Sequence, residues 1–345
     1  MANRNDVAKW AGVSEATVSR VFSGGAVKEA TRRKVLAAAE KLDYLPNTVA
    51  QNFAKGRSGH IGIILPYLPK VRLFSVDYFS ELLSGFGEAV REVGYDLLLL
   101  LRSPEEQDYS ELFRARKVDA IVILGAKEVP EQKAALAALK KEGQPFCLID
   151  QQFMGSGFNE IVADNIAGGY MATQHLVGRG YRKIAALSGP MVYSNARDRF
   201  RGYKLAMEEA GLTIRDQDLL QGNFSRKSGY EAALRLMQQG LPDAVFAAND
   251  RMAIGLIQGL KEAGVLAGRD IAVVGFDNAD ASKMCDPALS TVDVPYFEMG
   301  KTAARRLLQQ IFTGERQPFH ERLPVQLVVR DSCTRAGERI TIEEA

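Results

Sequence analysis

DVAKWAGVSEATVSRVFSGG, residues 6–25, has the pattern of two short helices joined by a tight turn. Gly12 interrupts the first helical pattern, and Ser14 is a good N-cap for the second. Gly24 and Gly25 then end the second helix. Two short helices with a glycine in the turn between them are typical of a helix-turn-helix, so the sequence predicts this motif near the start of the chain.

A third helix is expected to complete this N-terminal unit. Residues 31–42 carry apolar side chains at helical spacing, which predicts a stripe that packs on the first two helices. The expected stripe consists of Val35, Leu36, Ala39 and Leu42. Asn3 and Asp6 have the spacing of a capping box for the first helix, whereas Lys28 cannot cap the third.

The charge of the chain is unevenly distributed. Residues 1–60 contain ten lysines and arginines against five acids, a net +5, while the whole chain carries +2, which leaves −3 for the remainder. A basic unit on a mildly acidic body favours a polyanionic partner. A solvated basic surface without such a partner is the alternative that charge alone leaves open.

If this unit binds DNA, the first turn of its second helix reaches base edges in the major groove. Arg20 is suited to pair with guanine, Ala16 to touch a thymine methyl group and Glu15 to accept from cytosine. Thr17 and Ser19 are better suited to phosphates. A three-helix bundle with no role in nucleic-acid binding is the alternative.

PNTVAQNFAKG, residues 46–56, predicts a helix of about two turns between Pro46 and Gly56. A helix this short is not stable alone in water. Phe53 lies on it, and phenylalanine is one of the side chains that proteins insert between base pairs in the minor groove. We therefore expect Phe53 to act as such a wedge; the alternative is that it packs on the protein's own core.

From residue 61 onward, apolar runs alternate with amphipathic helical stretches. The first series of runs, suited to parallel strands buried on both faces, comprises IGIILPY (61–67), DLLLLL (96–101), AIVILG (120–125) and FCLID (146–150). After EIVADN (160–165), a second series comprises KIAALSG (183–189), AVFAAND (244–250) and IAVVGFDN (271–278). Two such series predict an α/β fold with two doubly wound subdomains. Late strands at LSTVDV (289–294) and LPVQLVV (323–329) indicate that the chain crosses between the subdomains more than once.

Polar residues directly follow several of these runs, namely Asp150, Asn249, Asp250 and Asp277. Ligands of such sheets bind beyond the carboxyl ends of the strands, so we expect these residues to rim one cleft between the subdomains. Carboxylates accept from hydroxyl groups, Arg199 can donate several hydrogen bonds, and Phe224 can lie against the apolar face of a sugar. For any single acid, a role as a loop cap is the alternative.

Other kinds of site have little support in the sequence. GFGEAV at Gly85 is expected inside an amphipathic helix, not at a dinucleotide. The three histidines are expected to be isolated from clusters of cysteines and acids: His60, His175 and His320. The three cysteines lack disulfide or zinc spacing and are expected to be reduced: Cys147, Cys285 and Cys333. We expect no catalytic residues, no metal site and no cofactor.

The N-terminal unit and the segment after it resemble the lactose repressor family (LacI/GalR) of bacterial transcription regulators. The quoted helix-turn-helix is followed by ATRRKVLAAAEKLDYLPNTVAQNFAKGRSGHIGIILP (30–66), so that motif, hinge and first core strand occur in family order and spacing. The similarity continues to about residue 330 through DNIAGGYMATQHLVGRGYRKIAALSGP (164–190), ARDRFRGY (196–203), FAANDRMAIG (246–255) and VVGFDN (273–278). Lys28 stands where the family usually has a serine cap, and Ser23 where asparagine is common.

This resemblance implies a helix-turn-helix domain over residues 1–45 and a hinge helix with linker over 46–59. It also implies a periplasmic-binding-protein-like core with three crossovers. The expected N-subdomain is 60–162 with 292–322, and the expected C-subdomain is 163–291 with 323–340. In the family, the hinge helix orders on operator DNA and enters the minor groove with its copy from the second subunit; leucine is usual where this chain has Phe53.

Carried over by position, the resemblance and the patterns above give two sets of candidate residues. The DNA-binding set is Asn5, Ser14, Glu15, Ala16, Thr17, Ser19, Arg20, Asn47, Ala50, Gln51 and Phe53. The effector-binding set is Tyr78, Phe79, Asp150, Tyr193, Asn195, Arg199, Phe224, Asn249 and Asp277. Tyr78 and Phe79 end a first βα loop that is several residues longer than the family's common pattern.

We therefore predict a homodimeric, non-enzymatic transcription regulator, expected to be a repressor, that binds a near-palindromic operator and a small effector. A sugar or glycoside fits the predicted cleft, and a purine or other small polar ligand is the alternative. A sugar-binding transport protein would need an export signal and no basic unit. No apolar run approaches the ~20 residues of a membrane span, so we expect a cytoplasmic protein without membrane contact.

Overall fold

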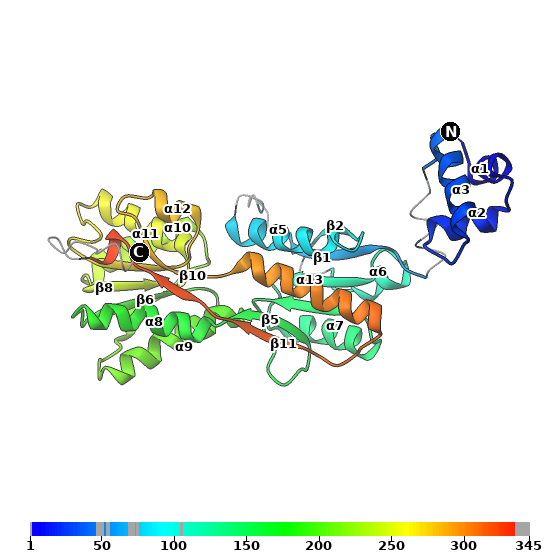
Figure 1. Ribbon diagram of the computed structural model, residues 1–345. Helices are drawn as coiled ribbons and strands as arrows, with labels where there is room; N and C mark the ends of the chain where they lie inside the picture. Colours follow the sequence, from blue (N-terminus) through cyan, green and yellow to red (C-terminus); the bar gives the residue numbers. More distant parts are fainter. Residues whose placement is uncertain are drawn as a thin grey trace. The chain divides into compact units, whose positions relative to one another are not determined.

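The computed structural model describes residues 2–45, 52, 56–67, 73, 76–103 and 106–334. It divides into a head unit, Met1–Gly59 with Arg116–Val118, and a core unit, His60–Ala115 with Asp119–Ala345 (Figure 1).

The described part of the head unit includes the helices α1 (Arg4–Ala11), α2 (Glu15–Phe22) and α3 (Glu29–Lys41). The predicted caps of the first two are confirmed. Asn3 and Asp6 form a capping box, and the Ser14 hydroxyl accepts from the Thr17 N–H. Gly12 ends α1 with a φ of 65°, a left-handed conformation that glycine adopts without strain. These signals set the turn of the helix-turn-helix.

The apolar stripe of α3 differs from the prediction at one position. Leu36 is 46% exposed, whereas Val35, Ala38 and Ala39 are buried against α1 and α2. Positions three and four residues apart share a helix face, so Ala38 and Ala39 lie with Val35 while Leu36 is turned away by about 100°. Lys28 makes no side-chain cap, as predicted.

The core unit contains two lobes, each built on a six-stranded sheet (Figure 1). The sheet of the first lobe has the order β11-β5-β4-β3-β1-β2 and is parallel throughout. Its strands are β1 (His60–Pro66), β2 (Asp96–Arg102), β3 (Ala120–Leu124), β4 (Phe146–Ile149), β5 (Asn159–Ala163) and β11 (His320–Leu323). Its helices are α5 (Asp77–Arg91), α6 (Ser110–Arg114), α7 (Pro130–Lys141) and α13 (Tyr296–Thr313).

The sheet of the second lobe has the order β12-β10-β9-β8-β6-β7, and only β12 runs antiparallel to its neighbour. Its strands are β6 (Ile184–Ser188), β7 (Leu219–Gln221), β8 (Ala244–Ala247), β9 (Ala272–Asp277), β10 (Ser290–Asp293) and β12 (Gln326–Val328). Its α-helices are α8 (Asn165–Gly178), α9 (Ser194–Glu209), α10 (Arg226–Gln239), α11 (Asp250–Glu262) and α12 (Asp280–Met284). Short 3₁₀ turns occupy Asp216–Asp218 and Asp331–Cys333.

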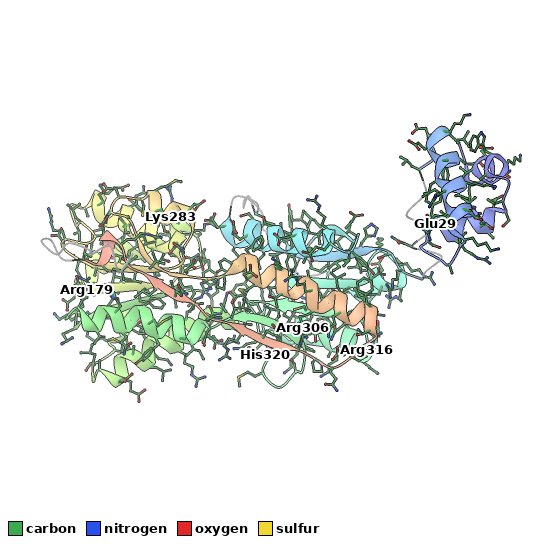
Figure 2. All side chains as sticks on the ribbon, viewed as in Figure 1. Glu29, Arg179, Lys283, Arg306, Arg316 and His320 are labelled. Atoms are coloured by element: carbon green, nitrogen blue, oxygen red, sulfur yellow. The ribbon has the colours of Figure 1, made fainter. Side chains whose placement is uncertain are left out.

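The chain passes between the lobes after β5, after β10 and after β11. The second passage leads through α13 to β11, which lies at the edge of the first sheet beside β5. His320 of β11 lies 2.8 Å from Glu160 of β5, and Arg306 of α13 pairs with Glu321 at 2.8 Å; Figure 2 labels Arg306 and His320. The two doubly wound subdomains predicted from the apolar runs are thus present.

The predicted environment of one strand, β2, is wrong. β2 was expected to be buried on both faces, but it lies at the edge of its sheet, and Leu99 and Leu101 are exposed. A run of leucines has no periodicity that distinguishes an edge strand from a central one. By contrast, β3 and β4 are buried at every position.

Glycines set the distance between α5 and α13. A Cβ atom on Gly85 would overlap the carbonyl oxygen of Phe297, and a Cβ on Gly300 would overlap that of Leu82. GFGEAV lies within the helix α5, as expected. Its first glycine, Gly85, allows α5 and α13 to pack closely.

Gly85→Ala is expected to lower the free energy of unfolding by about 1–3 kcal/mol, because the added methyl group overlaps rigid backbone. Gly87→Ala is the matched control, since nothing lies within 4 Å of its Cβ position; alanine should raise stability there by up to about 1 kcal/mol. Urea unfolding followed by circular dichroism measures both. Equal midpoints for the two variants would contradict the packing argument.

Candidate functional site

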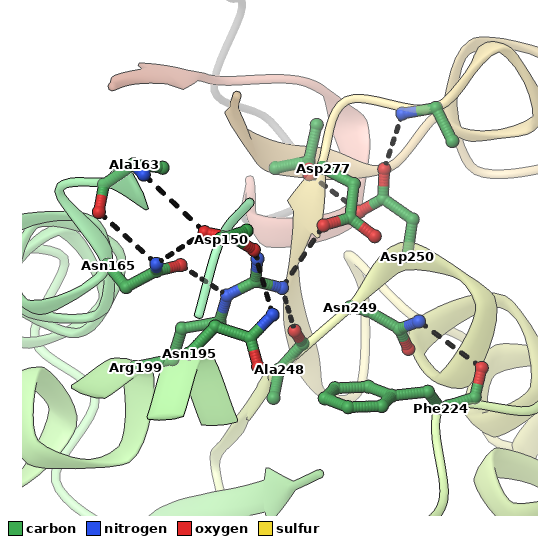
Figure 3. A network of polar contacts seen from close by, with 12 residues as sticks. Asp150, Ala163, Asn165, Asn195, Arg199, Phe224, Ala248, Asn249, Asp250 and Asp277 are labelled. Carbon is green, nitrogen blue, oxygen red and sulfur yellow. Dashed lines mark hydrogen bonds and ion pairs between the residues drawn. The ribbon is translucent and has the colours of Figure 1, made fainter. Parts of the chain in front are cut away.

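Arg199 is the centre of a polar cluster between the two lobes (Figure 3). It lies on α9 and is only 2% exposed. Gly169 of α8 faces the Arg199 backbone, and a Cβ there would overlap the Arg199 carbonyl oxygen, so α8 and α9 pack closely. The position of the guanidinium is thereby fixed by the helix pair.

The Arg199 guanidinium donates to groups from both lobes. In the second lobe it donates to Asn165 Oδ1 at 2.8 Å, to the Ala248 carbonyl at 2.8 Å and to Asp277 Oδ1 at 3.1 Å. From the first lobe it meets Asp150 Oδ2 at 3.3 Å and Tyr296 Oη at 3.4 Å. Its carbon also lies 3.9 Å from the centre of the Phe276 ring. A single cation therefore joins the ends of strands from two sheets.

Asp150, directly after β4, is fully buried. Its Oδ1 accepts from Asn165 Nδ2 at 2.8 Å, and its Oδ2 accepts from Asn195 Nδ2 at 2.8 Å as well as from Arg199. A buried carboxylate needs this many partners, since an uncompensated charge is costly in a low dielectric. Asp150 is thus held by residues of the opposite lobe.

Asp277, the last residue of β9, accepts from Arg199 and from the Tyr296 hydroxyl at 2.7 Å. Burial raises the pKa of Asp277 to about 6, although the positive charge of Arg199 and the Tyr296 hydroxyl act in the opposite direction. Burial also raises the pKa of Tyr296 well above its ordinary value, so its hydroxyl remains a donor. Tyr78 packs edge-on against Tyr296 with ring centres 5.1 Å apart.

The raised pKa of Asp277 predicts a pH-dependent stability. Because the folded pKa lies above the unfolded value, this group's contribution is complete below about pH 4 and is lost as pH rises through about 6. Asp277→Asn removes the titration and keeps the shape. The stability of wild type relative to the variant should therefore fall by on the order of 3 kcal/mol between about pH 4 and pH 7. Urea unfolding across this range measures it, and a difference that does not vary with pH would contradict the assignment.

An aromatic pair lies on the second-lobe side of the cluster. The rings of Tyr193 and Phe224 are 6.0 Å apart, and a Cβ on Gly189 would overlap the Phe224 ring. Asn249 Nδ2 donates to the Phe224 carbonyl at 3.2 Å, while its Oδ1 accepts from Met252 N–H and caps α11. Asn249 therefore positions the Phe224 loop, and both of its polar atoms are engaged.

Backbone strain gathers at the same place. Six described non-glycine residues have a positive φ, and three of them are candidate residues: Asp150 at 52°, Phe224 at 65° and Asp277 at 115°. Such conformations cost about 1–3 kcal/mol each and concentrate at functional sites.

Asn195 Oδ1 is also buried without a hydrogen-bond partner among the described residues. An acceptor left over in this way is available to a hydroxyl or amine of a ligand.

The structure brings together most of the predicted effector residues: Tyr78, Asp150, Asn195, Arg199 and Asp277 around the guanidinium, with Tyr193, Phe224 and Asn249 beside them. Phe79 lies on α5 and is instead buried in the hydrophobic core. Asp250 is fully buried and accepts from Thr291 Oγ1 at 2.6 Å and Ala279 N–H at 2.8 Å, so it ties the loop after β9.

Two members of the cluster were missed in the sequence. Asn165 follows β5 after one residue, Asp164, and Tyr296 follows β10 after Val294 and Pro295. The rule that polar residues after strands meet at one edge, applied to these later strands as well, would have indicated both.

Two of the histidines each have a single cysteine or acid partner. His320 meets Glu160, and His175 Nε2 lies 3.2 Å from Cys333 Sγ. These partners are distant in sequence and are brought together by strand pairing and by the return of the chain to the second lobe.

Within the described residues, no three His, Cys, Asp or Glu side chains gather as a metal site requires. None of the described helices combines the length and apolar character of a membrane span.

In the head unit, α2 buries Val18 and Val21 and leaves its opposite face exposed. That face carries Glu15, Ala16 and Arg20, with Thr17 and Ser19 half-buried beside it and Asn5 exposed on α1. Glu15 is paired with Arg4 at 2.9 Å, and Ser14 is occupied as the cap of α2. The candidates Asn47, Ala50, Gln51 and Phe53 lie outside the described residues.

Known protein families match parts of both the head unit and the core unit. Residues 5–47 match the bacterial regulatory proteins, lacI family, and residues 173–333 match the periplasmic binding protein-like domain. The HTH-type transcriptional repressor PurR of Vibrio vulnificus (strain CMCP6) is 32% identical over 337 residues, which are 96% of this chain and 98% of that protein. The chain belongs to the lacI family of bacterial regulatory proteins.

Solved members of the family share the whole architecture. The lac repressor dimer bound to operator and the anti-inducer ONPF has a TM-score of 0.85 and 28% identity, covering 96% of this chain and 99% of that one. The transcriptional regulator CelR in complex with cellobiose has a TM-score of 0.72 and 29% identity, covering 96% and 100%. The protein is thus a DNA-binding transcription regulator with a periplasmic-binding-protein-like core.

Proposed function

We propose that this regulator is a repressor whose operator affinity is controlled by a small polar effector bound at the Arg199 cluster. The observation that carries the proposal is that one buried guanidinium bonds residues of both lobes. An effector that replaces some of these bonds favours one arrangement of the lobes over another. A ligand shifts such an equilibrium by as much as its affinities for the two arrangements differ.

On the DNA side, the exposed face of α2 is the surface proposed to read bases. Arg20 carries no side-chain hydrogen bond among the described residues of the head unit, so its guanidinium is available to guanine. Ser14, Thr17 and Ser19 at and after the start of α2 are proposed to hold phosphates. This assigns base reading to Arg20, with Glu15 and Ala16 beside it.

We propose a homodimer, because a near-palindromic operator needs two copies of α2 related by two-fold symmetry. The exposed leucines of edge strand β2, Leu99 and Leu101, offer apolar surface for such a contact. The solved lac repressor with the similar architecture is itself a dimer on operator DNA. The site of action proposed for this protein is accordingly the cytoplasm, where the DNA lies.

A sugar or glycoside is the proposed effector class. Asp277, Asn195 and Arg199 supply acceptors and donors for vicinal hydroxyl groups, and the Tyr193–Phe224 pair supplies an apolar wall. CelR, of similar structure, is solved with cellobiose. A purine is the second candidate, since the same aromatic pair can stack on a planar ring and the relatives include repressors named PurR.

No enzymatic step is proposed, because the relatives are transcription regulators. A transport protein with the same core is also disfavoured, since it would not carry the lacI-type head.

A thermal-shift screen of sugars and purines with the full chain, followed by operator binding in the presence of the hit, tests the proposal. The operator itself can be selected from a random DNA library with the purified protein. We expect a hit that changes operator affinity by at least several-fold, the usual range of allosteric coupling. A tight ligand that leaves operator affinity unchanged would show that the cleft does not regulate DNA binding.

A further inference from the structure

A cavity of about 630 Å³ lies within the first lobe, where β1, β2 and β3 end. Its apolar wall comes from the ends of β1 and β3, including Pro66 and Ala126. All the described residues that line it fall between Ile64 and Gln132, so it includes none of the side chains around Arg199. Its volume lies within the range of small-molecule sites.

Two buried polar side chains line this cavity. Tyr109 is 5% exposed and Gln132 is 8% exposed, and Gln132 Nε2 donates to Tyr109 Oη at 2.9 Å. That bond leaves the Tyr109 O–H and the Gln132 Oε1, and neither atom has a partner among the described residues. Burial raises the pKa of Tyr109, so its hydroxyl keeps the proton and remains a donor. The pair thus offers one donor and one acceptor to a ligand.

The cavity also carries positive charge. Arg102, the last residue of β2, lines it, and its only carboxylate partner among the described residues is the half-exposed Glu106 at 4.0 Å. Lys127 lines it as well and has no ion pair within the described chain. Glu131 is the single acid in the lining, at the start of α7, whose N-cap Val129 supplies no side-chain cap. The unsatisfied N–H groups of that first turn add to the attraction for an anion.

We propose that this cavity is a second ligand site, separate from the Arg199 cluster, for a small hydroxylated anion of the sugar-phosphate class. Arg102 and Lys127 hold the anionic group. Tyr109 and Gln132 bond hydroxyl groups, and the ends of β1 and β3 cover the carbon skeleton.

The wall of the cavity is connected to the second lobe. Lys127 and Val129 line the cavity, and Glu128 between them contacts the other lobe: its N–H donates to the Val192 carbonyl at 2.8 Å, and its carboxylate accepts from Arg197. A ligand bound to Lys127 therefore acts on the segment that holds the lobes together. This second part of the inference rests on the proposed function, whereas binding at the cavity does not.

Isothermal titration calorimetry of the full chain with glucose 6-phosphate tests the site, with glucose as the neutral probe and gluconate as the carboxylate probe. We expect both anions to bind at millimolar concentration or below and glucose to bind more weakly. Arg102→Ala and Lys127→Ala should each weaken anion binding by about tenfold or more, because each removes a charge-assisted contact. Lys133→Ala is the matched control, since Lys133 is exposed on α7 and does not line the cavity.

Asp277→Asn separates the two sites, since it alters the Arg199 cluster and leaves the cavity intact. Anion binding that survives Asp277→Asn and is lost in Lys127→Ala supports the second site, whatever the fate of the proposed effector. The inference is overturned if neither anion binds wild type. It is also overturned if Lys127→Ala binds as Lys133→Ala does, or if Asp277→Asn abolishes binding.

Discussion

Replacing Arg199 by alanine is expected to lower the free energy of unfolding of the core by about 3–5 kcal/mol and to abolish the effector response. The substitution leaves Asp150 fully buried and Asp277 largely buried without their cation. It also removes the bonds to Asn165, Ala248 and Tyr296. The guanidinium bonds five described residues, of which Asp150 and Tyr296 belong to the first lobe.

Two further variants test the role of the Arg199 guanidinium. Arg201→Ala is the matched control, because Arg201 is exposed on the same helix; its effect should stay within about 0.5 kcal/mol. Arg199→Lys keeps the charge but loses the planar fork, so it should fold with intermediate stability and a weakened effector response. Circular dichroism is the suitable probe of urea unfolding, since the single tryptophan, Trp10, lies in the head unit. Matching unfolding curves for Arg199→Ala and Arg201→Ala would refute the role given to the cluster.

Arg20→Ala is expected to weaken operator binding by about 2–6 kcal/mol in a dimer that contacts two half-sites, at about 1–3 kcal/mol for each arginine–guanine pair. Arg20 is exposed on the face of α2 opposite Val18 and Val21. Stability should change little, since no described residue of the head depends on its side chain. Fluorescence anisotropy with a selected operator and a random duplex of equal length measures the effect.

The comparison of the two duplexes decides how Arg20 acts. If it reads a base, Arg20→Ala loses affinity for the operator and little for random DNA. An equal loss on both would assign Arg20 to phosphates. Arg33→Ala is the control, because Arg33 is exposed on α3 and its ion-pair partner among the described residues is Glu29 at 3.5 Å; the substitution should affect both duplexes weakly and alike.

Local patterns were sufficient to predict the elements whose sequence signals lie within a few residues of one another. The capping box at Asn3, the Ser14 cap and the left-handed Gly12 are set within a few residues, and each is present. The runs that became β3 and β4 are continuous and apolar because both faces of a parallel strand are covered. The order of strands, helices and lobes followed from these runs.

The head, the two sheets and the strand ends where Asp150 and Asp277 lie could be predicted from local sequence, since caps, periodicity and strand termini depend on neighbours along the chain. The contacts of those residues became known only from the fold. Tyr296 reaches Arg199 across 97 positions, His320 meets Glu160 across 160, and Asn249 is engaged in positioning Phe224. Sheet order also decided that β2 is an edge strand. Such contacts arise from the return of distant segments to one place, and no spacing between neighbours along the chain records that return.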